Sequence, residues 1–179
     1  MALIKKFIPK FILRFLRPIY HGLVAIVASF YFGHPSEKMI VVGITGTAGK
    51  SSTVAMLSHV LNLNRKKCGY TTTVNFFDGN SNFLNKHGLS MPGGWLLQKH
   101  LAQMLSNGCK YAVVECTSEG LAQNRHLGIN FDVAVFTNLT KAHLLAHGTF
   151  GNYQEAKSKL FSQLEKYPKK SFFPEIFLS

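Results

Sequence analysis

Acidic residues are scarce in this sequence, and none of them precedes Glu37. The chain carries 8 Asp and Glu residues against 20 Lys and Arg residues, so its formal net charge is +12. A balance this basic suggests a polyanionic partner, such as a nucleic acid, an anionic membrane or a phosphorylated small molecule. The arginine-rich stripe and the interleaved basic and aromatic residues of nucleic-acid binders are also lacking. We therefore expect no nucleic-acid partner.

Cysteine is rare as well. The three cysteines, Cys68, Cys109 and Cys116, form no CxxC pair, so neither a zinc site nor a disulfide framework is expected. We interpret them as reduced thiols in the core of a cytosolic protein. The apolar share of 46% is ordinary for a globular chain, and 179 residues allow one domain with a short appendage.

Residues 1–33 contain no long uninterrupted apolar run. Pro9 and Pro18 interrupt the segment, so we expect a short helix between them and a second helix from about residue 19 to residue 32. The uncharged stretch 19–33 is shorter than the roughly 20 residues that span a bilayer. The basic residues of the segment are Lys5, Lys6, Lys10, Arg14 and Arg17. We favour an amphipathic anchor on an anionic membrane surface; the alternatives are a spanning helix or uncleaved signal anchor, and a helix packed on its own domain.

From Met39 onward, apolar runs alternate with amphipathic stretches. Runs rich in β-branched or aromatic residues predict strands at 39–45, 70–76, 110–116 and 131–139. Helical spacing predicts helices at 50–63, 95–105, 118–125 and 152–164. Gly, Asn, Ser and Pro residues predict a loop at 78–92. The alternation predicts an α/β fold, in which a parallel sheet is flanked by helices.

A glycine-rich turn, GITGTAGKSST, joins the first predicted strand to the first predicted helix. Its glycines let backbone N–H groups point at phosphate oxygens, and the helix N-terminus adds a favourable dipole. Lys50 is expected to reach the β- and γ-phosphates of a nucleotide, and Ser51 to offer its hydroxyl to Mg²⁺. The general phosphate-loop pattern, G-x-x-x-x-G-K-[ST], has glycine at the position of Ile44. This loop instead reads G-x-x-G-T-x-G-K-S. The turn predicts ATP and Mg²⁺ as cofactors, with contacts from Gly46, Thr47, Ala48, Gly49, Lys50, Ser51 and Ser52.

This variant loop resembles that of the Mur ligases, and three further blocks match the same family in order. They are VVECTSEGLAQNR (113–125), FDVAVFTNLTKAHLLAHG (131–148) and YQEAKSKLF (153–161). Residues 39–165 resemble the P-loop-containing central domain of Mur ligases, most closely the UDP-N-acetylmuramoyl-tripeptide synthetase branch. The resemblance implies ATP-driven amide formation in peptidoglycan-precursor synthesis. The γ-phosphate passes to a carboxylate of a UDP-N-acetylmuramoyl peptide, and an amino acid then attacks the acyl phosphate.

The resemblance also implies roles for single residues. The implied catalytic residues are Lys50, Glu115, His143 and Lys157. The implied metal ligands are Ser51, Glu115, His143 and, once carbamylated, Lys157. Asn138 matches an asparagine near the nucleotide base, and the implied contacts to the UDP-muramoyl peptide are Thr72, Thr73, Thr117, Gln123 and Arg125. Each role has an ordinary alternative. Glu115 would cap a strand edge, His143 would lie on the surface, Lys157 would be a solvated helix lysine, and Thr72 and Thr73 would be plain strand residues. Ala142 and Leu145 stand where the family carries Asp, and Glu119 where tripeptide synthetases carry His.

We divide the chain into a basic apolar helical segment (1–38), the ATP-binding domain (39–165) and a C-terminal tail (166–179). Mur ligases have further N- and C-terminal domains that find no match here, so we expect a truncated ligase in the cytoplasm, at the inner face of the plasma membrane. One alternative is a catalytically inactive, membrane-attached nucleotide-binding module. Another is a related ligase such as folylpolyglutamate synthetase, which Gln123 and Arg125 argue against.

Overall fold

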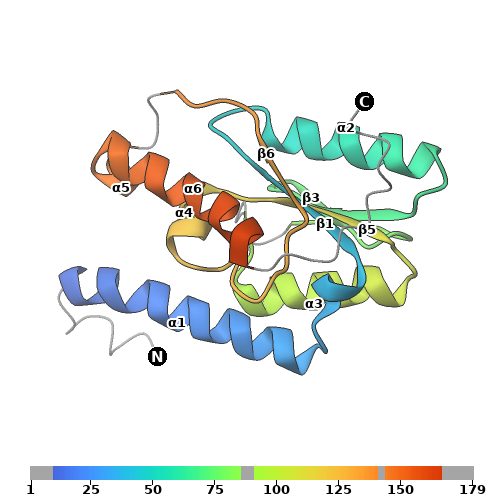
Figure 1. Cartoon of the computed structure of the whole chain (residues 1–179), viewed down its shortest axis with the longest axis horizontal. Coiled ribbons are helices and arrows are strands. Elements are labelled where there is room, and N and C mark those ends of the chain that lie inside the picture. The colour runs from blue at the N-terminus through green and yellow to red at the C-terminus, as the bar shows by residue number, and fades with distance from the viewer. Residues whose placement is uncertain (1–9, 86–90, 141–143, 167–179) are drawn as a thin grey trace.

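The computed structural model describes residues 10–85, 91–140 and 144–166 (Figure 1). Within these residues a six-stranded sheet has the order β4-β3-β2-β5-β1-β6. The strands are β1 (Ile40–Thr45), β2 (Cys68–Thr71), β3 (Asn75–Phe77), β4 (Asn82–Leu84), β5 (Tyr111–Glu115) and β6 (Val133–Phe136). Strands β2, β5, β1 and β6 pair in parallel, whereas β3 and β4 add an antiparallel edge. The predicted α/β class is confirmed.

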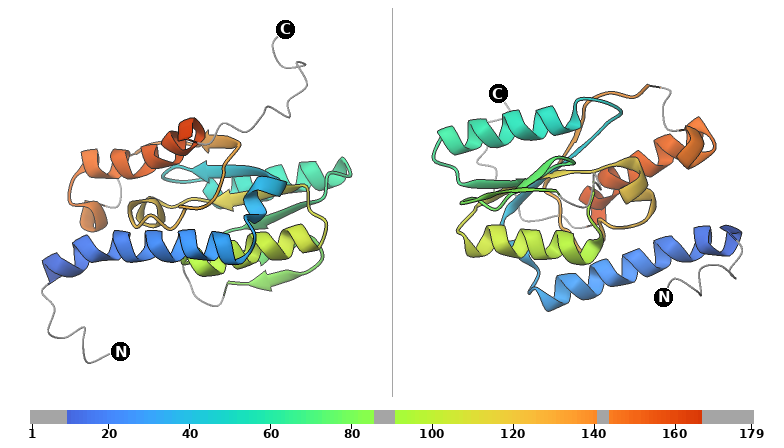
Figure 2. Two further views of the ribbon diagram at one scale, coloured as in Figure 1. Left: turned by 60° about the horizontal axis from the view of Figure 1, so that its bottom comes forward. Right: turned by 180° about the vertical axis from the view of Figure 1, so that it is seen from behind.

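Helices cover both faces of the sheet (Figures 1 and 2). Helix α2 (Lys50–Leu63) lies on one face, and α3 (Gly94–Ser106), α4 (Ser118–Ala122) and α6 (Phe150–Lys166) lie on the other. Helix α1 (Lys10–Tyr31) packs outside α3 and forms a further layer. The short elements are η2 (Pro35–Lys38) and α5 (Leu144–His147).

The side-chain alternation of β1 divides the core into two clusters. Val42 and Ile44 pack with Val54 of α2, whereas Val41 points to the cluster beneath α3 and α6. Gly43 is needed on this second face, because a Cβ there would lie 2.8 Å from Leu160 of α6. The three cysteines are buried and free, as expected.

The N-terminal helix differs from the prediction. A single helix, α1, continues through Pro18, where the sequence predicted a break between two helices. An interior proline lacks one hydrogen bond and crowds the preceding turn. Contacts of the following turns with the body compensate, since Gly22 lies against Leu127 and Ala25 lies against Gly94. None of the helices in the described ranges is long and apolar enough to cross a membrane.

The region after α2 also differs. One strand was predicted over 70–76, but β2 ends at Thr71 and the chain turns before β3. The Thr72 hydroxyl explains the turn, because its oxygen accepts hydrogen bonds from the backbone N–H groups of Val74 (3.2 Å) and Asn75 (3.0 Å). The predicted loop 78–92 contains strand β4, which pairs with β3. A hairpin therefore occupies a stretch that the sequence suggested was a strand followed by a loop.

Candidate nucleotide and metal site

The carboxyl ends of the parallel strands gather the candidate residues at one edge of the sheet. Strand β1 leads into the glycine-rich loop 46–49, and the neighbouring β5 ends at Glu115. On the other side of β1, strand β6 leads to Thr137 and Asn138. Ligands of open parallel sheets bind outside this edge, where the connections of neighbouring strands diverge. The predicted phosphate loop and the carboxylate predicted to bind metal thus lie at the ends of adjacent strands.

Two glycines shape the loop. Gly46 has a φ of 150°, and a Cβ on it would lie 1.9 Å from the Thr137 hydroxyl oxygen. Gly49 has a φ of 80° and directly precedes α2. The first N–H groups of a helix have no partners within it, so this end of α2 can receive an anion. Ser52, also predicted to contact the nucleotide, is exposed in the first turn.

Lys50 folds back over the loop. Its Nζ donates to the carbonyl oxygens of Gly46 and Thr47, each at 3.0 Å. Burial lowers the pKa of Lys50, while the nearby Glu115 carboxylate works in the opposite direction. The ammonium group is thus held above the loop that was predicted to bind phosphates.

Glu115 lies in a cluster of oxygen atoms. The Ser51 hydroxyl donates to Glu115 Oε2 at 2.7 Å, and the Thr73 N–H donates to the same oxygen at 2.9 Å. The Thr73 hydroxyl donates to Oε1 at 3.0 Å. Carboxylate and hydroxyl oxygens suit Mg²⁺, which keeps several waters and needs few protein ligands. Within the described residues no three His, Cys, Asp or Glu side chains come together in a group that could hold a metal ion.

Lys157 reaches the loop from α6. Its side chain is buried, its Nζ donates to Gly46 O at 2.6 Å, and it lies 4.6 Å from the centre of the Tyr153 ring. Burial, and secondarily the charge of Lys50, lower the pKa of Lys157 to about 8. An exposed helix lysine, which was the alternative, does not describe this side chain. The other implied metal ligand, His143, lies outside the described residues.

Asn138 and two residues that the sequence analysis did not single out brace the loop. Asn138 Oδ1 accepts from Ala48 N at 3.0 Å, and Asn138 O accepts from Thr47 N at 2.9 Å. The Thr137 hydroxyl donates to Ala48 O at 2.7 Å, and the Tyr153 and Thr47 hydroxyl oxygens lie 2.8 Å apart. Tyr153 was identifiable from its spacing, because it lies four residues before Lys157 on the same helix face.

The implied substrate contacts fall into two groups. Thr72 and Thr73 lie in the turn after β2, whereas the others surround α4. Thr117 caps α4, where its hydroxyl oxygen accepts from Gly120 N at 3.3 Å. Arg125 Nη2 donates to Gln123 Oε1 at 2.8 Å. Burial lowers the pKa of Arg125, and the charge of the nearby Glu119 works in the opposite direction.

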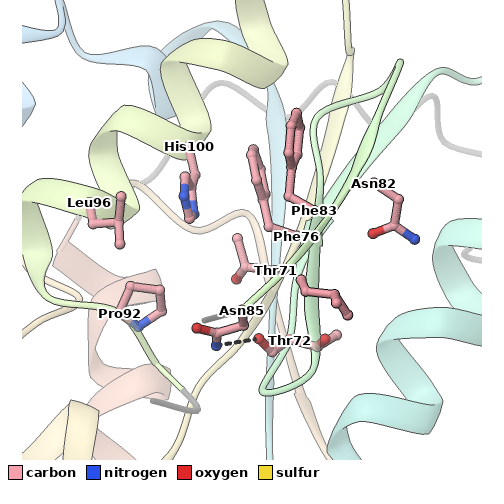
Figure 3. A pocket seen from close by; sticks show the side chains of 10 residues that line it. Thr71, Thr72, Phe76, Asn82, Phe83, Asn85, Pro92, Leu96 and His100 are labelled. Carbon is pink, nitrogen blue, oxygen red and sulfur yellow. Dashed lines mark hydrogen bonds between the residues drawn. The ribbon is translucent and has the colours of Figure 1, made fainter. Parts of the chain in front are cut away.

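A cavity of about 540 Å³ lies beside Thr72, between the β3–β4 hairpin and α3 (Figure 3). The rings of Phe76 and His100 stack in it, with centroids 3.8 Å apart and planes at 7°. Asn85 Nδ2 donates to Thr72 O at 3.3 Å, across the turn that leads into the hairpin. The sequence did not reveal this cavity, because its wall is the hairpin that was expected to be partly loop.

The sequence profile of the Mur ligase middle domain matches residues 44–172. The chain belongs to the Mur ligase family. It is 44% identical over 142 residues to the UDP-N-acetylmuramoyl-L-alanyl-D-glutamate–2,6-diaminopimelate ligase of Chlamydia abortus, which covers 79% of this chain and 29% of that protein. It is 42% identical over 149 residues to a UDP-N-acetylmuramyl-tripeptide synthetase of Treponema denticola, covering 82% of this chain and 28% of that protein.

Solved structures agree with this assignment. A UDP-N-acetylmuramoyl-L-alanyl-D-glutamate–2,6-diaminopimelate ligase matches this Mur ligase domain with a TM-score of 0.58 and 28% identity, over 69% of this chain and 24% of that one. E. coli FolC matches with a TM-score of 0.57 but only 15% identity, over 80% of this chain and 44% of that one, and so shares the fold alone. The chain thus spans less than a third of the length of its Mur ligase relatives named here.

Proposed function

We propose that this chain binds Mg-ATP and carries the phosphoryl-transfer chemistry of a peptidoglycan-precursor ligase. The observation that carries the proposal is the 2.7 Å hydrogen bond between Ser51 and Glu115. It brings the hydroxyl of Ser51, at the end of the phosphate loop, into contact with the carboxylate that ends the neighbouring strand β5. The charge of this carboxylate also acts on the Lys50 ammonium group. The Mur ligase family is ATP-dependent, and the residues present fit a magnesium–nucleotide complex.

The proposed reaction has two balanced steps. A carboxylate oxygen of a UDP-N-acetylmuramoyl peptide attacks the γ-phosphorus of ATP, which forms an acyl phosphate and releases ADP. The amine of an amino acid then attacks the acyl carbon, an amide bond forms, and inorganic phosphate and a proton leave. Mg²⁺ held by Ser51 and Glu115 would neutralise phosphate charge during the transfer. Lys50 and the N–H groups at the start of α2 hold the terminal phosphates in line, and such positioning supplies most of the catalysis of phosphoryl transfer.

Lys157 has the chemistry of a residue that becomes carbamylated. Only a neutral amine adds to carbon dioxide, and the product is a carbamate and a released proton. A pKa of about 8 leaves a larger neutral fraction at neutral pH than an exposed lysine has. The carbamate would replace a buried positive charge near Gly46 with oxygen atoms that can help to hold metal. His143 is proposed as a further metal ligand, from the family resemblance alone.

The peptide substrate is proposed to lie along the carboxyl edge of the sheet. Thr73 hydrogen-bonds to Glu115, and the adjacent Thr72 lines the cavity beside α3. A ligand along these two residues would therefore extend from Glu115 into the cavity. Arg125 offers a guanidinium group for a phosphate or carboxylate, with Gln123 fixing its orientation. Thr117 and, near the nucleotide base, Asn138 complete the proposed contacts. ATP and nucleotide-linked precursors place this reaction in the cytoplasm.

The test compares Mg-ATP binding by calorimetry, and phosphate release with UDP-N-acetylmuramoyl-L-alanyl-D-glutamate, in wild type and Lys50→Ala. Lys110→Ala is the matched control, because Lys110 is exposed and far along the chain from the loop. We expect Lys50→Ala to lower phosphate release on the order of 100-fold and Lys110→Ala to leave it unchanged. Equal behaviour of all three proteins would show that the site is misassigned. Binding without phosphate release in wild type would instead favour the inactive nucleotide-binding module.

A further inference from the structure

Helix α1 has two faces that differ in the size of their residues. The face toward the body carries the small buried residues Gly22, Ala25, Ala28 and Ser29. The opposite face carries large apolar residues at spacings of three and four, which form one continuous stripe along the helix. This apolar stripe consists of Leu16, Ile19, Tyr20, Leu23, Ile26, Val27, Phe30 and Tyr31, whose exposed fractions run from 39% to 71%.

The small-residue face is fixed to the body and is not available to a partner. Ala25 approaches Gly94 so closely that a Cβ on the glycine would lie 2.4 Å from the alanine Cβ. The Ser29 hydroxyl donates to Gly128 O at 2.8 Å. A surface helix of a globular protein normally turns its large apolar residues inward. Here the arrangement is reversed, and an exposed patch of this kind marks an interaction surface.

We propose that the apolar stripe inserts into the headgroup layer of an anionic lipid bilayer, with α1 lying parallel to the membrane plane. Only one side of the helix is free, so lipid can cover the stripe but cannot surround the helix. Tyr20 and Tyr31 suit the boundary between headgroups and acyl chains, because their rings are apolar with a polar end. Trp95 of α3 extends this belt, with its ring 5.1 Å from that of Tyr31.

The charges around the apolar stripe match an anionic surface. Three basic residues near the stripe are exposed: Arg17 at one end of it, Lys38 at the end of η2, and Lys99 one helical turn beyond Trp95. Glu37 is the only carboxylate in the sequence before Asp78. Basic residues beside an amphipathic helix strengthen its attraction to anionic lipids. A second copy of the chain is a less suitable occupant, because two molecules of net charge +12 repel each other.

The test measures co-sedimentation of the full chain with phosphatidylcholine vesicles that do or do not contain phosphatidylglycerol. The variant pair Leu23→Gln with Val27→Gln removes two large side chains from the stripe. Its matched control is Val60→Gln with Leu63→Gln, which changes the same residue types at exposed positions of α2. We expect the first pair to weaken binding to anionic vesicles at least tenfold and the control pair to leave it unchanged. Circular dichroism and thermal melts establish that both double variants are folded.

Trp95 supplies a second measurement, because it is the only tryptophan of the chain. On anionic vesicles its emission should shift to shorter wavelength, and iodide should quench it less. Binding by the Leu23→Gln, Val27→Gln pair equal to wild type overturns the proposal, as does equal binding to vesicles without phosphatidylglycerol. A wild-type dimer that this pair dissociates, without vesicle binding, shows that the stripe binds a second copy. ATP binding is measured in parallel, so that loss of the nucleotide site is distinguished from loss of the lipid surface.

Discussion

At the scale of single residues, hydrogen bonds from neighbouring groups satisfy the buried Glu115 carboxylate. It accepts one hydrogen bond from the Ser51 hydroxyl and two from Thr73, and its side chain is 2% exposed. A buried carboxylate is costly unless it is hydrogen-bonded or coordinates a cation. The three donors orient both oxygens, and Thr73 therefore positions the carboxylate that we propose as a metal ligand, in addition to its proposed contact with substrate.

Glu115→Gln should remove the metal dependence of nucleotide binding. The amide keeps the size of the side chain but loses its charge and one acceptor, so we expect Mg-ATP affinity to fall at least about tenfold. Affinity for ATP in the presence of a chelator should change little. Glu155→Gln is the control, since Glu155 is exposed on α6. Calorimetric titrations with and without Mg²⁺ provide the measurement, and an unchanged magnesium dependence would remove Glu115 from the metal site.

Lys157 should make stability depend on pH. Burial lowers its pKa from the ordinary 10.5 to about 8, and unfolding restores the higher value. Between these values the unfolded chain binds more protons, so the free energy of unfolding rises with pH across that window and does not depend on this group below it. Urea unfolding should give a shallower rise for Lys157→Met than for wild type. Lys159→Met, two residues away, should keep the wild-type slope; equal slopes for all three would mean that Lys157 is not buried as a charge.

At the scale of elements, the contact between α1 and α3 depends on Gly94. The two helices approach so closely at Ala25 that only Gly94 fits opposite it, whereas the adjacent Gly93 has no atom within 4 Å of a Cβ position. Small residues at this crossing bring the helices together and leave the large residues of α1 outside. The packing that holds the helix and the exposure of its apolar stripe therefore have the same cause.

The same substitution at these two neighbouring positions tests the contact. Gly94→Ser forces α1 away from α3, and we expect it to lower the free energy of unfolding by about 1–3 kcal/mol. Gly93→Ser should have little effect or stabilise slightly, because Gly93 is the N-cap of α3 and serine is a favoured cap. Urea denaturation of both variants provides the measurement. Equal stabilities would show that α1 does not rest closely on α3.

Burial of all three thiols is a property of the whole molecule, since Cys68, Cys109 and Cys116 come from separate segments. Burial raises the pKa of Cys68 to about 12 and also that of Cys116, so little reactive thiolate forms at neutral pH. We expect Ellman's reagent to react slowly with the folded chain and rapidly with all three thiols in guanidinium. Mg-ATP should slow the folded-state reaction further, because a ligand of the native state suppresses unfolding. Rapid reaction of one thiol without denaturant would contradict this packing.

The sequence by itself determined three features, because each depends on a pattern that is local in the chain. Strand and helix periodicity gave the α/β class, the glycine pattern gave the phosphate loop, and the loop with the three matching blocks gave the family. The division of the chain at residues 38 and 165 and the roles of the site residues stay predictions. Tertiary structure decided the features that depend on distant segments. Packing against α3 carried α1 through Pro18, the Thr72 turn brought Thr73 to Glu115, and the fold of α6 brought Lys157 to Gly46. The Thr72 turn itself is local, but the contacts of Thr73 with Glu115 and of Lys157 with Gly46 join residues tens of positions apart. No local pattern encodes such contacts; the closing of the sheet and the stacking of its helices bring the groups together.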